Sequence, residues 1–234
     1  MENCLILIIN NYIYVLIFGP MKKYTLLFIA LFIVSCSDND DTELKPFYVA
    51  DNGVTIKARD WVTSGTTGEL NGVTYTAVDN ALLKKMVGNN EDYSKIVTTL
   101  LSGKTSEVFN TGLSPTGAYN PSVDITTWDV SNITHLEGIF EHISNFNQDL
   151  NNWDTSSLVS MPGAFINAKN SNPKIDKWNV SNVTNMNATF FGSKGFNGDL
   201  SGWNVEKVTE CTSFAFTGDF PKSKWPNFTN CSPD

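Results

Sequence analysis

The sequence has little histidine, few cysteines and no excess of basic residues. Two histidines, four cysteines and 16 lysine and arginine residues stand beside 24 acidic residues in a chain of 234, and the formal net charge is −8. A nucleic-acid partner needs a basic face that displaces counterions from the phosphate backbone, so this charge argues against nucleic-acid binding. An acidic, solvated surface is typical of an exported protein that has to remain soluble.

The two histidines offer no catalytic or metal centre. His135 and His142 are seven residues apart, and neither has a cysteine or serine at the spacing that a metal site or an activated nucleophile needs. A surface or cap role is therefore favoured for both.

Carboxylate pairs are the remaining candidates for catalysis. Glu91-Asp92, or Asp129 with Asp154, resemble the paired acids of glycoside hydrolases. Asp129 and Asp154 recur with the repeat described below, however, and a role in shaping turns explains them. The acidic cluster at 38–41 lacks the glycine and closing glutamate of a calcium loop, and no phosphate-binding glycine loop occurs. We therefore predict no enzyme activity, no metal and no cofactor.

The N-terminal region carries the pattern of a lipoprotein signal. Lys22-Lys23 precedes an apolar run from Tyr24 to Val34, and the lipobox "IVSC" closes it at Cys36. Eleven apolar residues are too few to span a bilayer, which favours a signal peptide over a transmembrane helix. The sequence predicts cleavage before Cys36, lipidation of its thiol, and attachment to a membrane through that lipid.

Three N-terminal segments follow from this signal. Residues 1–20 are expected to lie upstream of the true start at Met21, although Cys4–Phe18 would form a second apolar helix if translation began at Met1. Residues 21–35 are the signal peptide, and 36–46 are an acidic tether. An acidic patch behind a lipidated cysteine resembles the export signal of Bacteroidetes-type surface lipoproteins. This resemblance implies a lipid-anchored protein of the outer membrane that faces the cell exterior.

Tryptophan recurs at a fixed spacing in the second half of the chain. Four tryptophans lie 25 residues apart, and a fifth follows 22 residues later. Apolar residues stand at the second, fifth and eighth positions after most of these tryptophans, and phenylalanine stands at the twelfth in three cases. The predicted repeat core comprises Trp128, Trp153, Trp178, Trp203, Trp225, Phe140, Phe165 and Phe190. A fixed period of this length predicts a repeat solenoid.

Each 25-residue phrase is interpreted as one coil of that solenoid, with the tryptophan inward and stacked on the tryptophan of the coil before. An inward side chain contributes roughly 1.5–3 kcal/mol when fully buried, whereas ordering costs about 1–2 kcal/mol for every residue of the coil. One coil therefore cannot fold alone. We expect a short parallel strand near each "DLxxW", a single helical or 3₁₀ turn near "TxMxxxF", and polar corners at the Asp, Asn and Ser residues that follow each tryptophan.

The phrases "WDVSNITHLEGIF", "FNQDLNNW", "WNVSNVTNMNATFF" and "FNGDLSGW" closely resemble the repeat of BspA-like leucine-rich-repeat surface lipoproteins, which is also found in mycoplasma surface proteins. The resemblance implies a leucine-rich-repeat-like solenoid exposed at the cell surface. Some members of that family bind host extracellular proteins and mediate adhesion or coaggregation. The family has no catalytic residues to transfer to this chain.

The array is short and its second coil departs from the pattern. Thr155 stands where valine is usual, and Ser171 stands where the neighbouring coils have Phe146 and Phe196. Residues 122–234 hold the four repeats and a C-terminal cap.

Residues 47–121 are predicted to form a mixed α/β N-terminal cap and a diverged first coil, with Phe109 and Ile125 in apolar columns. "GVTIKARD" and "GVTYTAVD" alternate in strand fashion, and Ala81–Val87 has helical spacing with Lys84 and Lys85 outward. A hairpin plus a helix is expected to shield Trp128.

Two cysteines fall near the C-terminal end of the array. Cys211 occupies an inward column, where it is either a small buried hydrophobe or the partner of Cys231 in a disulfide that an envelope location permits. The sequence leaves both alternatives open.

The positions just before each tryptophan vary most from coil to coil, while their inward neighbours stay apolar. We take these variable positions as the candidate binding surface: Thr126, Thr127, Asn151, Asn152, Asp176, Lys177, Ser201 and Gly202. The favoured function is a binding or adhesion module for host or neighbouring-cell proteins or glycans. The alternative is a structural or envelope-assembly lipoprotein without a specific ligand.

Overall fold

The computed structural model describes residues 4–9, 12–17, 45–89, 91–104 and 123–234. The chain divides into two compact units, Met1–Asn39 and Asp40–Asp234. Within the described residues, no helix is long and apolar enough to cross a membrane. The predicted signal peptide, the lipidation site Cys36 and most of the tether lie outside the described residues.

In the first unit, β1 (Cys4–Ile9) and β2 (Tyr12–Ile17) pair antiparallel, with Cys4 opposite Ile17. The alternative of an apolar helix over Cys4–Phe18 is therefore wrong. The segment is rich in isoleucine, tyrosine and valine, whose branched or aromatic side chains favour extended backbone.

The second unit begins with the antiparallel hairpin of β3 (Phe47–Val49) and β4 (Ile56–Ala58). Asn52 shapes its turn, because the side-chain Oδ1 accepts from the backbone N–H of Val54 at 3.0 Å and of Thr55 at 2.9 Å. Phe47 and Ala58 face inward and start a small core with Val62, Ala77 and Val97.

A second hairpin joins β5 (Thr67–Leu70) and β6 (Val73–Ala77). Its turn is Asn71-Gly72, with φ of 52° and 78°, the positive values that a two-residue type I′ turn requires. The sequence predicted one hairpin in the cap, whereas the structure has two, and the segments "GVTIKARD" and "GVTYTAVD" lie in different hairpins. Each pairs with the strand just before it, because a local turn is available to both.

Helix α1 (Asn80–Gly88) covers the segment with helical spacing. The Asp79 side chain caps it by accepting from the Leu82 N–H at 2.8 Å. Leu83 and Val87 are buried, while Lys84 and Lys85 are exposed. After the helix, β7 (Ile96–Val97) adds to β6 in parallel.

The cap continues into the repeats through a parallel pair, β8 (Gly103–Lys104) with β9 (Ile133–His135). At this junction the Thr98 hydroxyl bonds twice to the backbone of Asp129. It accepts from the Asp129 N–H at 2.8 Å and donates to the Asp129 carbonyl at 3.0 Å. Trp128 is buried beside it, at 2% exposure. Phe109, predicted for an apolar column, lies outside the described residues, whereas Ile125 is fully buried.

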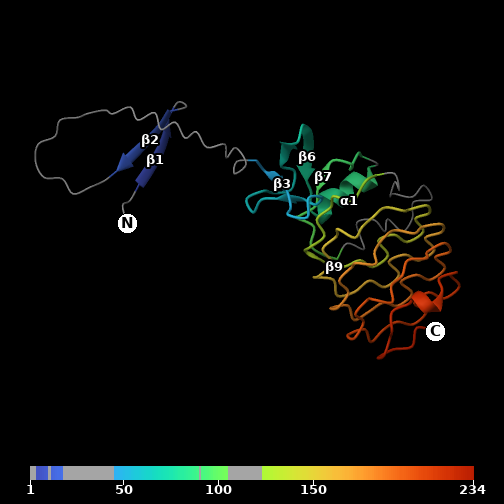
Figure 1. Cartoon of the computed structure of the whole chain (residues 1–234). Helices are drawn as coiled ribbons and strands as arrows, with labels where there is room; N and C mark the ends of the chain where they lie inside the picture. Colours follow the sequence, from blue (N-terminus) through green and yellow to red (C-terminus); the bar gives the residue numbers. More distant parts are fainter. Residues whose placement is uncertain (1–3, 10–11, 18–44, 90, 105–122) are drawn as a thin grey trace, which may run out of the picture. The chain divides into compact units, whose positions relative to one another are not determined.

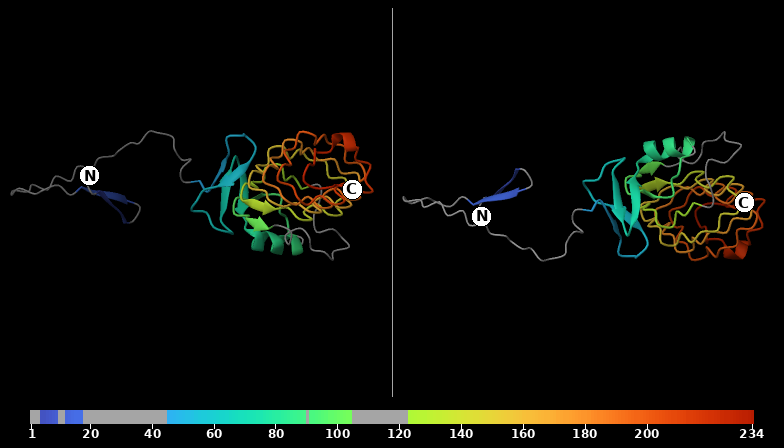
Figure 2. Two further views of the ribbon diagram at one scale, coloured as in Figure 1. Left: turned by 90° about the horizontal axis from the view of Figure 1, so that it is seen from below. Right: turned by 90° about the horizontal axis from the view of Figure 1, so that it is seen from above.

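Beyond the junction the chain winds in successive 25-residue turns that lie one on another (Figure 1). We name them coil 1 (128–152), coil 2 (153–177), coil 3 (178–202) and coil 4 (from 203). Seen from below and from above, the coils overlie one another as nested loops with the cap at one end (Figure 2).

Backbone hydrogen bonds join each coil to the next. Leu136 N–H donates to the Ser160 carbonyl at 3.0 Å, Met161 N–H to Asn185 at 3.0 Å, and Met186 N–H to Glu210 at 2.6 Å. Single parallel bridges connect the same column: His135, Ser160, Asn185 and Glu210.

The extended segments differ from the expected ones. Near "DLxxW" the described coils have one bridge, between Asp149 and Lys174, and the longer column of bridges lies at the start of the segment expected to be a helical turn. Residues with left-handed backbone recur just after that column and end each extended run: Gly138, Gly163, Ala188 and Ser213, with φ between 53° and 63°. The coil turns too often for a long strand or a helix to form.

The interior is a set of aromatic columns. Trp153 and Trp178 stack at 5.8 Å between ring centroids, and Trp178 and Trp203 at 6.5 Å, with interplanar angles of 7° and 3°. Phe165 stacks on Phe140 at 5.0 Å and on Phe190 at 5.1 Å. These stacks run through the whole length of coils 1–3, so every coil packs on its neighbours through rings.

The tryptophans also bond to the preceding coil, which the sequence analysis did not anticipate. The Trp153 indole N–H donates to the Ile125 carbonyl at 3.0 Å, and the Trp178 indole N–H to the Leu150 carbonyl at 3.0 Å. Trp203 repeats the contact with Ile175 at 3.3 Å. An indole therefore fills the coil and satisfies a buried carbonyl of the coil before it.

The two polar residues that replace apolar ones in coil 2, Ser171 and Thr155, differ in their hydrogen bonding. The buried Ser171 hydroxyl donates to the Ile143 carbonyl at 2.9 Å and accepts from the Phe146 N–H at 2.9 Å, so it joins coils 1 and 2. Thr155 is 3% exposed, and its hydroxyl oxygen has no hydrogen-bond partner. A polar atom buried in this way lowers stability.

The sequence predicted that Trp225 continues the tryptophan column, but in the structure it does not. It is half-buried, its indole N–H donates to Phe220 O at 3.1 Å within the same coil, and its ring meets Phe214 edge-on at 5.6 Å. It follows the short 3₁₀ helix η1 (Lys222–Lys224) and belongs to the C-terminal cap. Coil 4 is shorter than the others, which shifts this tryptophan out of register.

Candidate binding surface

The eight residues of the candidate binding surface lie in turns rather than on a strand. Each pair occupies the two central positions of a turn that the following tryptophan closes, as in the bond from Trp178 N–H to the Ile175 carbonyl at 3.0 Å. The residues at both ends of these turns are buried, so the central pair projects outward at a corner of the coil. The candidate binding surface is therefore a column of turns at one corner of the stacked coils, and we call these eight residues the corner column.

The cap covers the first part of this column. The Ile56 N–H of β4 donates to the Thr127 carbonyl at 2.9 Å, and Asn52 Nδ2 donates to the Asn152 carbonyl at 3.4 Å. Thr126 is half-buried and donates its hydroxyl to Asp124 at 2.7 Å. This end of the column is engaged in holding the cap to the coils.

The middle of the column joins two coils. Asn151 Nδ2 donates to Asp176 Oδ1 at 2.9 Å, and Asn151 Oδ1 accepts from the Lys177 N–H at 3.0 Å. A ligand would have to compete with these contacts. Lys177, Ser201 and Gly202 remain as exposed residues, and a Cβ added at Gly202 would meet nothing within 4 Å.

A column of charges runs beside these turns, four residues before each tryptophan: Asp124, Asp149, Lys174 and Asp199. Lys174 Nζ bonds to Asp149 Oδ2 at 3.1 Å. Burial acts to raise the pKa of Asp149, but the Asn151 N–H and the Lys174 ammonium outweigh it and hold that pKa below its ordinary value. These residues recur every 25 positions, so this column is visible in the sequence.

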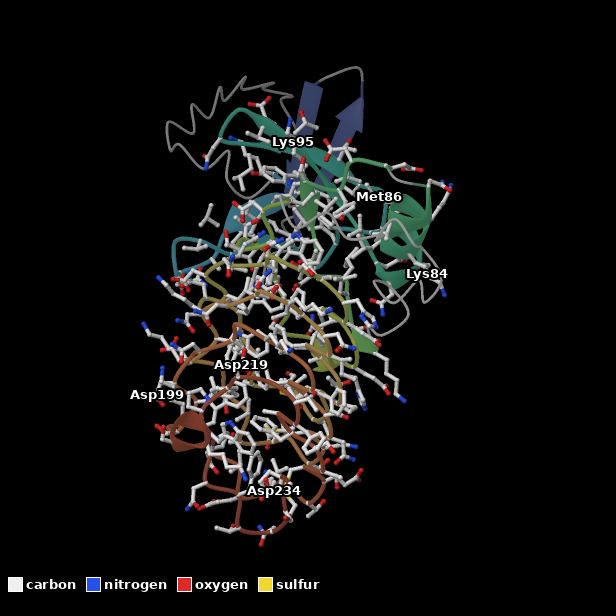
Figure 3. All side chains as sticks on the ribbon, turned by 90° about the vertical axis from the view of Figure 1, so that its right-hand side faces the viewer. Lys84, Met86, Lys95, Asp199, Asp219 and Asp234 are labelled. Atoms are coloured by element: carbon white, nitrogen blue, oxygen red, sulfur yellow. A yellow bond between two sulfur atoms is a disulfide. The ribbon has the colours of Figure 1, made fainter. Side chains whose placement is uncertain are left out.

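Asp199 lies at the outer edge of the coils (Figure 3). The Ser201 hydroxyl, its backbone N–H and the nearby Lys224 hold the pKa of Asp199 below its ordinary value. The carboxylate is therefore ionised at neutral pH, and Ser201 is bonded to it at 2.6 Å. The exposed end of the corner column presents mixed charge.

An asparagine ladder was also missed. Asn147 Oδ1 accepts from the Asn172 N–H at 2.8 Å, and Asn172 Oδ1 accepts from the Asn197 N–H at 2.9 Å. These asparagines are 25 residues apart, so the sequence contained the signal. They stabilise the stack and are not free for a ligand.

The acidic residues and histidines that were considered for catalysis do not gather into one site. Asp129 and Asp154 each accept, at 3.1 Å, from the backbone N–H two residues ahead, which is a turn-shaping contact. His135 lies in β9, and the exposed His142 contacts Glu141 at 3.5 Å. In the part of the chain that the structure describes, no three His, Cys, Asp or Glu side chains gather as metal ligands would.

Cys211 and Cys231 form a disulfide, with Cα atoms 5.8 Å apart. The tail that carries Cys231 lies along coil 4, where the Phe214 N–H donates to Pro233 O at 3.1 Å and Phe228 meets the Phe214 ring edge-on at 5.0 Å. The disulfide and these contacts fasten the C-terminal cap over the last coil.

Residues 105–225 match the family model DUF285, described as a mycoplasma protein of unknown function. The match spans 121 of the 234 residues, just over half, and the chain belongs to this family. It includes coils 1–3 and the repeated part of coil 4, in agreement with the resemblance to a repeat of mycoplasma proteins. No curated protein and no solved structure matches the chain.

Proposed function

We propose that the protein is a lipid-anchored surface protein whose stacked coils form a BspA-like, leucine-rich-repeat-like solenoid that binds an extracellular protein or glycan. One observation carries the binding part of the proposal. The inward residues of the coils are fully engaged in packing, while the exposed end of the corner column, at Lys177, Ser201 and Gly202, lies outside that core and differs in residue type from coil to coil. Side chains that packing does not constrain are available for recognition.

The exposed end of the corner column is small. Coils about 4.8 Å apart give a strip of roughly 10–15 Å over the exposed turns, less than a standard interface of about 800 Å² per partner. A single copy should therefore bind weakly. Many lipidated copies on one cell would raise the avidity by orders of magnitude without new contacts.

The anchor is tested by Cys36→Ser. A hydroxyl does not form the thioether, so the variant should leave the membrane fraction, whereas the wild-type chain should remain in it. Protease treatment of intact cells then tests the outward orientation in the outer membrane. Full protection from the protease would place the protein in the periplasm and contradict a surface location.

Binding is tested by immobilising the Cys36→Ser chain at high and low density and adding fibronectin, fibrinogen and a glycan panel. The test variant is Lys177→Glu with Gly202→Arg, since both positions are exposed. The control, Lys194→Glu with Thr212→Arg, makes the same charge changes at other exposed positions.

Density-dependent capture that the test variant abolishes and the control variant retains supports the binding module. The alternative, a structural or envelope-assembly lipoprotein, has its own support, because much of the outer polar surface bonds coil to coil through Asn151, Asn172 and Asn197. Absence of capture at every density favours that alternative.

A further inference from the structure

The outer side of the β3–β4 hairpin gathers basic and aromatic residues. Tyr48 lies directly opposite Lys57 across the hairpin, and the Arg59 guanidinium lies 5.3 Å from the centroid of the Tyr48 ring. Arg59 Nε also donates to the Lys45 carbonyl at 3.1 Å, which brings the N-terminal edge of the hairpin into the same group. Their strand neighbours Phe47 and Ala58 point to the other side, into the small core.

Trp61 extends this group. It lies in the turn that the Val62 N–H closes on the Arg59 carbonyl at 2.9 Å, and its side chain is 56% exposed. Trp128, Trp153, Trp178 and Trp203 are at most 5% exposed and Trp225 is half-buried, so Trp61 is the most exposed of the tryptophans. We name Lys45, Tyr48, Arg59 and Trp61 the hairpin face. Lys57 is not part of it, because its ammonium lies 3.6 Å from the buried Asp129 carboxylate of coil 1.

The sign of the charge differs between the hairpin and the coils. Residues 45–62 contain Lys45, Lys57 and Arg59 against Asp51 and Asp60, a net charge of 3 − 2 = +1. Residues 123–234 contain seven lysines and 12 acidic residues, a net charge of 7 − 12 = −5. Because Lys57 is paired with Asp129 of coil 1, Lys45 and Arg59 are the cations that the hairpin can offer to an anionic surface, whereas the net charge of the coils repels such a surface.

The hairpin also lies close in sequence to the proposed anchor. Lys45 follows Cys36 by nine residues, and nine residues reach at most about 30 Å when fully extended. A lipid on Cys36 would keep the hairpin face within that distance of the headgroups. A tether of this length raises the effective concentration of a weakly binding surface.

We propose that the hairpin face docks on the anionic lipid headgroups of the membrane that holds the anchor. The inference rests on the proposed lipidation of Cys36. Lysine and arginine are attracted to anionic headgroups, and tryptophan and tyrosine favour the boundary between headgroups and acyl chains. Docking at the hairpin places the cap on the membrane and leaves coil 4, at the other end of the stack (Figure 1), to meet the surroundings.

Trp61 supplies the readout. The Cys36→Ser chain is titrated with vesicles whose acyl chains carry bromine near the headgroups, in phosphatidylglycerol mixtures and in pure phosphatidylcholine. Bromine quenches an indole only on contact, so quenching in the anionic vesicles reports docking of Trp61. Trp61→Phe should remove most of the signal, because four of the other indoles are buried and that of Trp225 is half-buried.

Charge variants measure the contribution of the hairpin face. Each basic residue near an anionic surface raises partitioning about fivefold, so Lys45→Gln with Arg59→Gln should weaken it by about 25-fold. Lys84→Gln with Lys85→Gln on α1, where Figure 3 shows Lys84, is the control with the same loss of charge and should change it little. Asp60→Lys should strengthen partitioning, a gain that misfolding does not produce.

The proposed lipid anchor and the proposed docking of the hairpin face are tested by separate outcomes. Wild-type lipidated chain that does not float with vesicles contradicts the anchor, while the Cys36→Ser titration still tests the docking. The docking proposal is overturned if Trp61 is not quenched in anionic vesicles, if neutral vesicles quench it equally, or if the α1 control loses as much as the hairpin variant. Capture of an acidic glycan by the hairpin face without vesicle quenching would also overturn it.

Discussion

The N-terminal cap and the coils reach order by different routes. In the cap, contacts between residues close in sequence define the local structure. Asn71-Gly72 closes one hairpin, Asn52 shapes the turn of the other, and Asp79 caps α1. In the coils, the contacts that recur are 25 or 28 residues long, as in Asn172 to Asn147 and Trp178 to Leu150. The coils have almost no regular secondary structure among the described residues, yet they contain most of the buried core.

This difference shows that a stack of irregular turns is stabilised between coils and not within one. A turn residue of the cap affects mainly its own hairpin, although the buried residues of α1, Leu83 and Val87, share one core with the coils. A residue in a middle coil touches the coils on both sides, so the same kind of substitution should cost more there.

The largest expected effect is that of Trp178→Ala. The ring packs between Trp153 and Trp203, and truncations of this size in a core cost about 3–5 kcal/mol. Chemical denaturation should show the loss, and Trp225→Ala should cost less because that ring is half-buried and bonds within its own coil. Equal losses for the two variants would contradict the dependence on contacts between coils.

Gly195→Ala should cost about 2–3 kcal/mol. Gly195 has φ of 104°, and a Cβ there would stand 2.9 Å from the backbone Cα of Asn170 in the preceding coil, which resists displacement. Gly202→Ala is the control, since its Cβ would meet open space and should change stability by less than about 0.5 kcal/mol. Thermal or urea unfolding checks both, and a tolerated Gly195→Ala would show that the coils can separate locally.

Thr155→Val should raise the free energy of unfolding by about 1–2 kcal/mol. The substitution keeps the shape, removes a buried hydroxyl that has no hydrogen-bond partner, and restores the valine found at this position in the other coils. Thr189→Val is the opposing control, because the Thr189 hydroxyl donates to the Met186 carbonyl at 2.8 Å, and it should lower stability. A loss with Thr155→Val would indicate that its hydroxyl has a partner in solution.

On the cap side, Asp79→Ala should cost about 1 kcal/mol, the typical value for a lost helix N-cap. Hydrogen exchange resolved by segment should show faster exchange over α1 and little change in coils 3 and 4. Asp79→Asn, which retains a capping oxygen, should recover most of the loss. Exchange that rises equally in the distant coils would mean that the cap and the coils unfold as one unit.

The smallest expected effect is that of Asp149→Asn, a few tenths of a kcal/mol, because the Asp149–Lys174 pair is exposed to solvent. The pKa of Asp149 is lowered in the folded protein, so its contribution is complete above the unfolded pKa and disappears as pH falls through the folded pKa. Urea unfolding of the variant and the wild type should differ at about pH 7 and agree at about pH 2. A difference that persists in acid would exclude the carboxylate as its source.

How much of the structure the sequence predicts also differs between the cap and the coils. A local signal identified the α1 segment, since the apolar residues of Ala81–Val87 have helical spacing. Two strand segments of the cap, those of β4 and β6, were predicted from their alternation. The strands with which they pair, β3 and β5, were not, and the pairing depends on turns such as Asn71-Gly72. The corner column was identified from its variability, while the fact that Asn151 bonds to Asp176 is visible only in three dimensions.

The sequence by itself determined the period, the inward columns and the acidic net charge, because these are properties of spacing and composition that survive any arrangement of the chain. Only the tertiary structure decided what the polar residues do. The Trp178 indole, the Ser171 hydroxyl and Asn147 find their partners 25 to 28 residues away, and such a partner exists only once the coils have stacked in register. A buried polar group is satisfied by geometry and not by residue type, which is why Ser171 of coil 2 bonds to coil 1 while Thr155 of the same coil has no hydrogen-bond partner.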